Sequence, residues 1–217
     1  HRQLKPTRCS GWALPAVQTA PIASTTVTRQ RERRTTAPPL IAVDVGNNRI
    51  KLGRFAGPAG SVLRDPDSVL QLSGDELQVE RLSAWLDQQA GSAAWWIGSV
   101  NRPTTSRLVD WLRANRPADR VTLLACGDLP LEVRLERPDM VGIDRLLDAV
   151  AANYLRQPSR PAVVVDMGTA ITVDLVSADG AFCGGAIAAG ISTSARALHA
   201  FTDLLPLIDV SELTQAP

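Results

Sequence analysis

Two segments of the chain share one plan, and this repetition limits the possible folds more than any other feature. The first, LIAVDVGNNRIKLGRF (residues 40–55), runs from an apolar strand through Asp44 and a glycine turn into an alternating strand. The second, AVVVDMGTAITVDLV (residues 162–176), repeats that order around Asp166. A strand, a tight turn and a returning strand are typical of a β-hairpin. We therefore predict two duplicated lobes, each opening with such a hairpin.

The composition favours an α/β protein. Apolar residues make up 45% of the 217 residues and aromatic residues only 4%, so the core must consist mainly of Val, Leu, Ile and Ala. Such cores suit strands that are covered by helices. Apolar spacing predicts helices over 76–90, 104–115 and 192–204, a helix that begins near Asp144, and further strands over 93–100, 120–125 and 181–187. No run of eighteen apolar residues is present, so we expect no membrane partner.

The N-terminal 39 residues differ from the rest of the chain. They hold seven Lys and Arg residues against a single acid, Glu32, and several prolines. A nucleic-acid-binding tail and a transit peptide are both compatible with this charge, but we interpret residues 1–39 as a disordered basic extension and expect no nucleic-acid partner. Residues 40–157 are then the first lobe and residues 158–217 the start of the second. The three cysteines lack metal-ligand or redox spacing, so we expect a cytoplasmic location.

The two glycine turns suit nucleotide chemistry. A strand that ends in aspartate and glycine presents backbone N–H groups in a tight turn, where an anion such as phosphate can approach. Phosphoryl transfer also needs Mg²⁺, which proteins usually hold through one or two carboxylates, waters and phosphates. Asp44 is the candidate in the first turn. In the second turn, Asp166, Gly168, Thr169 and Thr172 offer a carboxylate and hydroxyl groups to a cation or a phosphate.

A third motif, GIDR at residues 142–145, lies between the two hairpins. An aspartate at a helix start is by default a cap or a partner of the helix dipole. In a kinase, the Asp144 carboxylate would instead take the proton of a substrate hydroxyl, and Arg145 would hold an anionic group of that substrate.

Four ordered motifs carry a family resemblance: DVGNNRIK at 44–51, GIDR at 142–145, DMGTAITVDLV at 166–176 and GGAIAAG at 184–190. Together they resemble the type III pantothenate kinases. The resemblance implies two ribonuclease-H-like lobes of the actin, sugar kinase and Hsp70 ATPase superfamily. It also implies a homodimer that uses ATP to convert pantothenate to 4′-phosphopantothenate, the first step of coenzyme A biosynthesis.

The resemblance also assigns site residues. Those implied for ATP are Asp44, Val45, Gly46, Asn47, Asn48, Lys51 and Thr169. Those implied for pantothenate are Gly142, Ile143, Asp144 and Arg145, with Asp144 as the catalytic base. Asp166 matches the ligand of a monovalent cation, K⁺ or NH₄⁺, and Asp44 would hold Mg²⁺ through phosphates or water. Gly184, Gly185 and Gly190 resemble the segment near the nucleoside.

The chain departs from the family pattern at three points. Asn48 stands where the family has Thr or Ser, which keeps hydrogen-bonding capacity but loses the hydroxyl. Ala189 stands where the family has Pro. Family members also continue past the position of Pro217, so we expect an incomplete second lobe and a polypeptide that folds poorly or is inactive unless the remainder is supplied.

Two other functions fit parts of the pattern. A non-catalytic accessory protein would keep the ATP-binding fold without turnover, whereas a ribonuclease-H-like nuclease would use Asp44, Asp144 and Asp166 to bind two metals. The glycine turns favour nucleotide phosphates over a duplex. We assign no role to His199, expect Trp95 and Trp96 in the core and at the lobe interface, and leave Asp174 as a second cation residue or an outward strand position.

Overall fold

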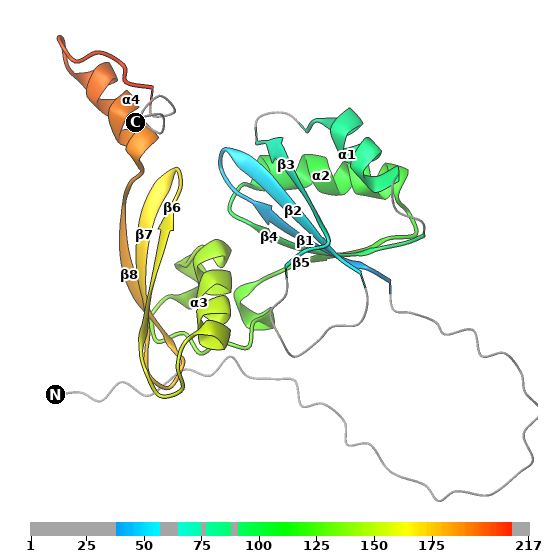
Figure 1. The fold of residues 1–217 in the computed structure, drawn as a ribbon, viewed down its shortest axis with the longest axis horizontal. Coiled ribbons are helices and arrows are strands. Elements are labelled where there is room, and N and C mark those ends of the chain that lie inside the picture. Colours follow the sequence, from blue (N-terminus) through cyan, green and yellow to red (C-terminus); the bar gives the residue numbers. More distant parts are fainter. Residues whose placement is uncertain (1–37, 57–64, 75–76, 88–90, 210–217) are drawn as a thin grey trace, which may run out of the picture.

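The computed structural model describes residues 38–56, 65–74, 77–87 and 91–209. These residues form two β-sheets that lie side by side, with helix α3 (Ile143–Leu155) between them (Figure 1). The first sheet has five strands in the order β3-β2-β1-β4-β5, and the second has three in the order β6-β7-β8. Both sheets begin with a hairpin, as the repeated sequence plan predicts.

The five-stranded sheet is mixed. Its strands are β1 (Leu40–Val45), β2 (Arg49–Phe55), β3 (Ser68–Ser73), β4 (Ala94–Ser99) and β5 (Arg120–Leu123). The first three are antiparallel neighbours, while β1 pairs in parallel with β4, and β4 with β5. Alternate residues of β1 and β2 are buried because their side chains point to one face of the sheet, which α1 (Val79–Asp87) and α2 (Arg102–Asn115) cover (Figure 1).

Helix α2 shows how local sequence sets an element boundary. Asn101 caps the helix, since its side-chain oxygen accepts a hydrogen bond from the Thr104 N–H at 3.2 Å. Pro103 follows in the first turn, where its missing N–H costs no helical hydrogen bond. Leu108 and Leu112 then fall on one face of the helix and are fully buried against the sheet.

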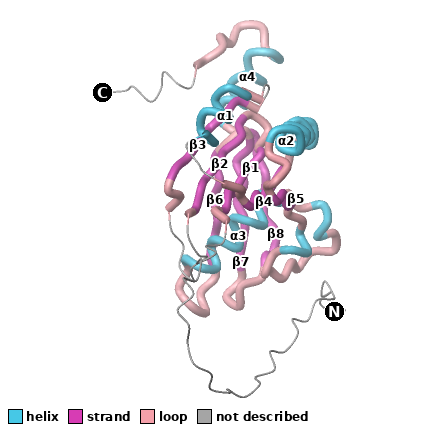
Figure 2. Tube along the Cα trace, turned by 90° about the vertical axis from the view of Figure 1, so that its right-hand side faces the viewer, coloured by secondary structure: helices cyan, strands magenta, loops and turns pink. Residues whose placement is uncertain are grey.

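The second sheet is an antiparallel meander. It comprises β6 (Ala162–Met167), β7 (Ala170–Val176) and β8 (Phe182–Ala189), and it leads into α4 (Ile191–Phe201). Helix α4 lies beyond the end of the strands and not over a face of the sheet (Figures 1 and 2). The short 3₁₀ helices Cys126–Asp128 and Pro138–Met140 precede α3. A second core forms where Leu146 and Ala149 of α3 pack against Val176 and Phe182.

Helix α3 contacts both sheets, namely β4 of the first and β6 and β7 of the second. Gly98 of β4 allows this close approach, because a Cβ atom there would lie 2.7 Å from Leu147 Cδ1. The buried side chains of α3 belong to the second core. The division of the chain after residue 157 therefore stays a prediction, with α3 as the element that joins the two halves.

The predicted fold class, an α/β protein with two ribonuclease-H-like lobes, is confirmed. Within the described residues, the second sheet has three strands where the first has five. Strand β3 was not predicted, and the extension at residues 1–39 lies almost wholly outside the described residues. Trp95 is buried as expected, whereas Trp96 is half exposed. No helix in the described part of the chain is long and apolar enough to cross a membrane.

Candidate active site

Hydrogen bonds to its carbonyl groups hold the first glycine turn in place. The Gly46 N–H closes the turn by donating to Arg49 O at 3.0 Å. The Asn48 carbonyl accepts from the Gly74 N–H at 2.9 Å, and the Asn47 carbonyl accepts from Asn101 Nδ2 at 3.5 Å. Within the described residues, no hydrogen bond uses the N–H groups of Asn47 and Asn48. The turn therefore keeps two donors for an anion.

Gly74, at the end of β3, is a supporting residue that sequence reasoning missed. A Cβ atom at this position would lie 2.8 Å from the Asn48 carbonyl carbon and 2.9 Å from the Asn47 oxygen. Real Cβ atoms do not approach that closely, so a side chain here would displace the first turn. The only sequence signal was the glycine itself, directly after an unrecognised strand.

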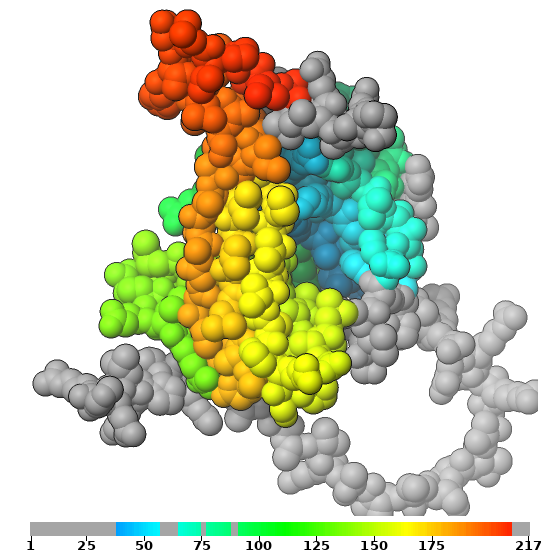
Figure 3. All heavy atoms as spheres, turned by 60° about the vertical axis from the view of Figure 1, so that its left-hand side comes forward, coloured from blue at the N-terminus to red at the C-terminus, as the bar shows by residue number. Residues whose placement is uncertain are grey.

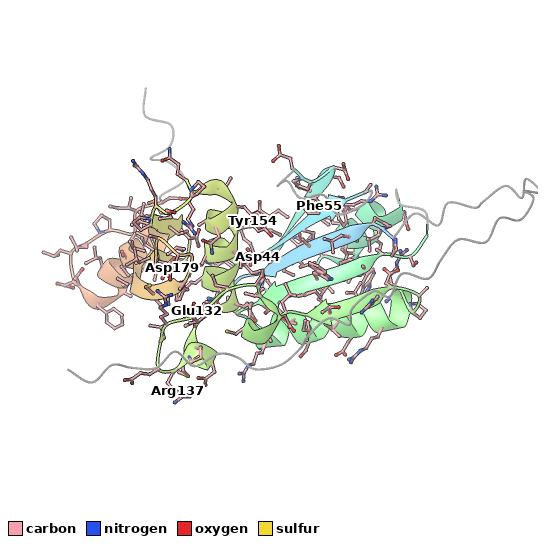
Figure 4. All side chains as sticks on the ribbon, turned by 90° about the horizontal axis from the view of Figure 1, so that it is seen from below. Asp44, Phe55, Glu132, Arg137, Tyr154 and Asp179 are labelled. Carbon is pink, nitrogen blue, oxygen red and sulfur yellow. The ribbon has the colours of Figure 1, made fainter. Side chains whose placement is uncertain are left out.

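Asp44 and Lys51 face each other across the first hairpin. They are register partners on β1 and β2, and Lys51 Nζ lies 3.3 Å from Asp44 Oδ2. Both side chains are partly open to solvent, with 46% of Asp44 and 64% of Lys51 exposed. Figure 4 shows Asp44 on the side of the first sheet that faces α3. A carboxylate and an ammonium group are thus available beside the first turn.

The second turn is braced by the start of α4. The Gly168 N–H donates to Ala170 O at 2.8 Å, and Thr169 O accepts from the Gly190 N–H at 2.9 Å and from Thr193 Oγ1 at 2.7 Å. A Cβ atom at Gly190 would lie 2.7 Å from Thr169 O, so no larger residue fits there without moving the turn. Gly190, which the family resemblance implies to lie near the nucleoside, is therefore also required to be glycine by the close packing of the second turn.

The two turns meet. Asn48 Nδ2 donates a hydrogen bond to Thr169 Oγ1 at 2.8 Å, across 121 residues of sequence. Asn48 is the residue that replaces the hydroxyl residue of the family motif, and its longer amide makes this connection. The predicted ATP-binding residues of both halves therefore lie at one place.

Asp144 is the second residue of α3. Gly142 is the residue before the helix, and Asp144 Oδ1 accepts the Arg145 N–H at 2.8 Å. A Cβ atom at Gly142 would collide with that same Oδ1, so a side chain there would push the carboxylate aside. The other oxygen of Asp144, Oδ2, has no hydrogen-bond partner among the residues that the structure describes. That oxygen is free to accept a proton.

Asp148, one helical turn after Asp144, was not predicted as a site residue. Burial raises the pKa of its carboxyl group to about 6, and the negative charges of Asp166, Asp144 and Asp44 add to this effect, whereas Lys51 opposes it. Asp148 can interact with all three predicted acids only if they lie around it. The acids of both lobes are therefore near enough for their charges to act on Asp148, and the four-residue spacing from Asp144 was the available signal.

An open groove of about 540 Å³ extends from Asp148 along α3 and β6. It is lined by Asp148, Ala151, Ala152, Leu155, Arg156 and residues 162–166, so it includes Asp166. One end of the groove is therefore acidic and the remainder is mainly apolar.

Arg145 does not point freely into this region. Its Nε lies 2.9 Å from Asp174 Oδ2, and its Nη2 pairs with Asp174 Oδ1. The hydrogen bond to Asp174 raises the pKa of Arg145, although desolvation acts against it. Asp174 is 2% exposed, so the interpretation of this residue as an outward strand position is wrong.

The predicted cation residues offer suitable oxygen donors. No group of three or more His, Cys, Asp or Glu side chains in the described part of the chain is arranged to hold a metal ion. Mg²⁺ in nucleotide sites often takes one or two carboxylates and completes its shell with water and phosphate. The partly exposed Asp44 and the exposed Asp166 fit that kind of binding.

Comparison with known proteins decides the family. The family model for type III pantothenate kinase matches residues 40–216. The chain belongs to the type III pantothenate kinase family. Curated members from Paramagnetospirillum magneticum and Rhodopirellula baltica are 47% and 36% identical, over 81% and 78% of this chain and 68% of each relative. The chain thus spans about two thirds of the length of these relatives.

Among solved structures, the ethanolamine utilization protein EutJ from Carboxydothermus hydrogenoformans is 16% identical, with a TM-score of 0.41. The alignment covers 78% of this chain and 58% of EutJ. The match to the type III pantothenate kinase family is stronger than this structural likeness. Members of that family are kinases that phosphorylate pantothenate for coenzyme A biosynthesis. The family match favours a kinase over the accessory protein and the nuclease.

Proposed function

We propose that this chain transfers the γ-phosphate of ATP to the 4′-hydroxyl of pantothenate at the place where its two glycine turns meet. The observation that carries the proposal is the Asn48–Thr169 hydrogen bond, which joins the phosphate-binding candidates of both halves. The charges of Asp144 and Asp44 both raise the pKa of Asp148, which supports a position of the proposed base near the first turn.

ATP would bind mainly through its phosphates. The free N–H groups of Asn47 and Asn48 supply donors, and Lys51 supplies a positive charge. The backbone of Val45 and Gly46 leads into this turn, and the Gly46 position lets a phosphate approach. The Thr169 hydroxyl contributes from the second lobe. Phosphate binding would thus draw on both sheets.

Asp144 would act as the general base. Its Oδ1 is already bonded to the helix, which fixes the carboxylate and leaves Oδ2 to accept the proton of the substrate hydroxyl as that oxygen attacks phosphorus. Gly142 and Ile143 would form the adjacent wall, and Arg145 would meet the carboxylate of pantothenate. The substrate would therefore lie along the start of α3.

Two cations complete the proposal. Asp44 would hold Mg²⁺ through phosphates or water, and Asp166 would hold K⁺ or NH₄⁺. When bound, these ions would neutralise negative charge on the phosphates during transfer. The Asp148 carboxyl group faces the same region, so cation binding there would favour its charged form. We further propose a cytoplasmic homodimer that does not bind nucleic acid.

The test is a reaction with ATP, Mg²⁺, K⁺ and pantothenate, followed by mass spectrometry for 4′-phosphopantothenate. We expect product from the wild-type protein when the remainder of the second lobe is supplied, and turnover lowered about a hundredfold or more in Asp144→Asn with ATP affinity kept. Asp110→Asn, which removes an exposed acid on α2, is the matched control and should change neither value. ATP binding without phosphorylated pantothenate would contradict the proposal and support an accessory protein.

A further inference from the structure

We propose that Asp174 is a positioning residue for substrate binding, which holds Arg145 by one edge of its guanidinium group and leaves the other edge for the substrate carboxylate. This inference rests on the proposed function, because it assigns how the substrate-binding arginine is presented. It gives a specific role to a carboxylate at a strand position in the second lobe.

The hydrogen bonds define which edge is held. Asp174 accepts from Nε and from Nη2 of Arg145, so both carboxylate oxygens are used on one side of the planar group. Within the described residues, no hydrogen bond uses the remaining nitrogen, Nη1. A guanidinium group can bind a second carboxylate through a free edge while the first edge stays paired.

The aromatic ring of Phe182 fixes the plane of the guanidinium group. Arg145 Cζ lies 5.7 Å from the centre of the ring, within the range of a cation–π interaction. Phe182 is fully buried, so this surface does not move easily. Arg145 is thus held by a carboxylate at one edge and a ring at one face, which limits the directions in which Nη1 can point.

The glycines of β8 provide the space for this arrangement. Asp174 is the register partner of Gly185, and a Cβ atom at Gly185 would lie 2.8 Å from Asp174 Cα and collide with its carboxylate. Gly184 has a φ of +88°, and the strand register shifts between Asp174 and Val176. Glycine is suited to this left-handed conformation at a bulge. The GG pair, which resembles a nucleoside-binding segment, therefore has a second role here.

A contribution to folding stability does not by itself explain the buried Arg145–Asp174 ion pair. Replacing a buried ion pair by apolar residues is often neutral or stabilising, whereas removing one partner leaves a buried charge unpaired. Arg145 follows Asp144 directly, and the charge of Asp144 also acts on it. The ion pair therefore fixes the arginine beside the proposed base, where an acidic substrate with an attacking hydroxyl would bind.

The experiment measures pantothenate and ATP affinities of the chain by titration calorimetry, together with thermal unfolding. We expect Asp174→Asn to weaken pantothenate binding about tenfold and to change ATP affinity less than about twofold, because only one edge contact is lost. Asp179→Asn is the matched control, since it removes an aspartate that pairs with Arg134 at an exposed site. We expect it to change neither affinity.

If Asp174→Asn does not fold, Arg145→Lys tests the proposal. Lysine keeps a positive charge beside Asp174 but lacks the planar guanidinium group, which can bind a carboxylate at each of two edges. We expect a pantothenate-specific loss of about tenfold. Equal losses for both ligands, or unchanged pantothenate affinity in both variants, would overturn the positioning role. Failure of the wild-type chain to bind pantothenate would instead overturn the proposed function, and this inference with it.

Discussion

The two hairpins of this protein have the same local plan but different surroundings. In the first, Asp44 pairs with Lys51, and in the second, Asp166 pairs with Thr172. The valine before each acid shows the contrast, since Val43 is 4% exposed and Val165 is 54% exposed. Alternating sequence is sufficient to form each hairpin, while burial depends on which elements pack over it.

The outer face of the second sheet is apolar and open within the described residues. Its exposed side chains are Val163, Val165, Met167, Val173 and Leu175. Figure 3 shows β6, β7 and β8 at the surface, with no helix over them. The inner face of the same sheet packs against α3. The first lobe therefore owes its stability to a complete core, and the second depends more on α3.

Truncation of the two equivalent valines should give the largest difference in stability between the lobes. Val43→Ala should lower the free energy of unfolding by about 2 kcal/mol, because it removes buried apolar surface and leaves a cavity. Val165→Ala should cost less than about 0.5 kcal/mol, since its side chain is mostly in water. Urea unfolding of both variants measures the difference. Equal costs would show that the outer face of β6 is covered in solution.

The glycines that brace the two turns give the next largest effect. Gly190→Ala should weaken ATP binding about tenfold, because the added Cβ forces the Gly168–Thr169 turn to move. Gly74→Ala presses on the first turn less severely and should have a smaller effect. Gly127→Ala is the control, as no atom lies within 4 Å of its added Cβ. Calorimetric titration with ATP would contradict this ranking if Gly74→Ala had the larger effect.

Asp148 should make stability depend on pH. The folded protein raises its pKa from 3.8 to about 6, so its carboxyl group binds a proton more tightly when folded. This contribution is fully present below about pH 4 and is lost as the pH rises through about 6. Asp148→Asn should therefore raise stability at pH 7.5 by about 1 kcal/mol, allowing for solvent screening, and change it little at pH 4.

Melting curves at both pH values test this prediction. The exposed Asp110→Asn serves as a control for the general loss of an acid. A gain of equal size at pH 4 and pH 7.5 would show that the substitution acts through packing and not through the charge of Asp148.

Features fixed by local sequence were predictable. The hairpins, their acids and the start of α3 follow from apolar alternation, glycine turns and the GIDR motif. Strand β3 was missed because SVLQLS (68–73) is only partly alternating, and its pairing with β2 is what stabilises it.

Features set by contacts between distant segments were not predictable. Asp174 was ambiguous because a strand sequence does not reveal that an arginine 29 residues earlier will pair with it. Asp148 looked like an ordinary helical residue, and what distinguishes it is its burial together with the negative charge of Asp166 on the second sheet. The family resemblance supplied roles for individual residues, and the fold supplied the interactions between them.

A double-mutant cycle on Asn48 and Thr169 is the most direct test of the claim that the two turns form one nucleotide site. ATP affinity would be measured for Asn48→Ala, Thr169→Ala and the double variant. If the turns act together, the double variant should bind ATP about fivefold better than the product of the single losses predicts, since both substitutions break the same connection. Losses that multiply without any coupling would show two independent turns and contradict a shared site.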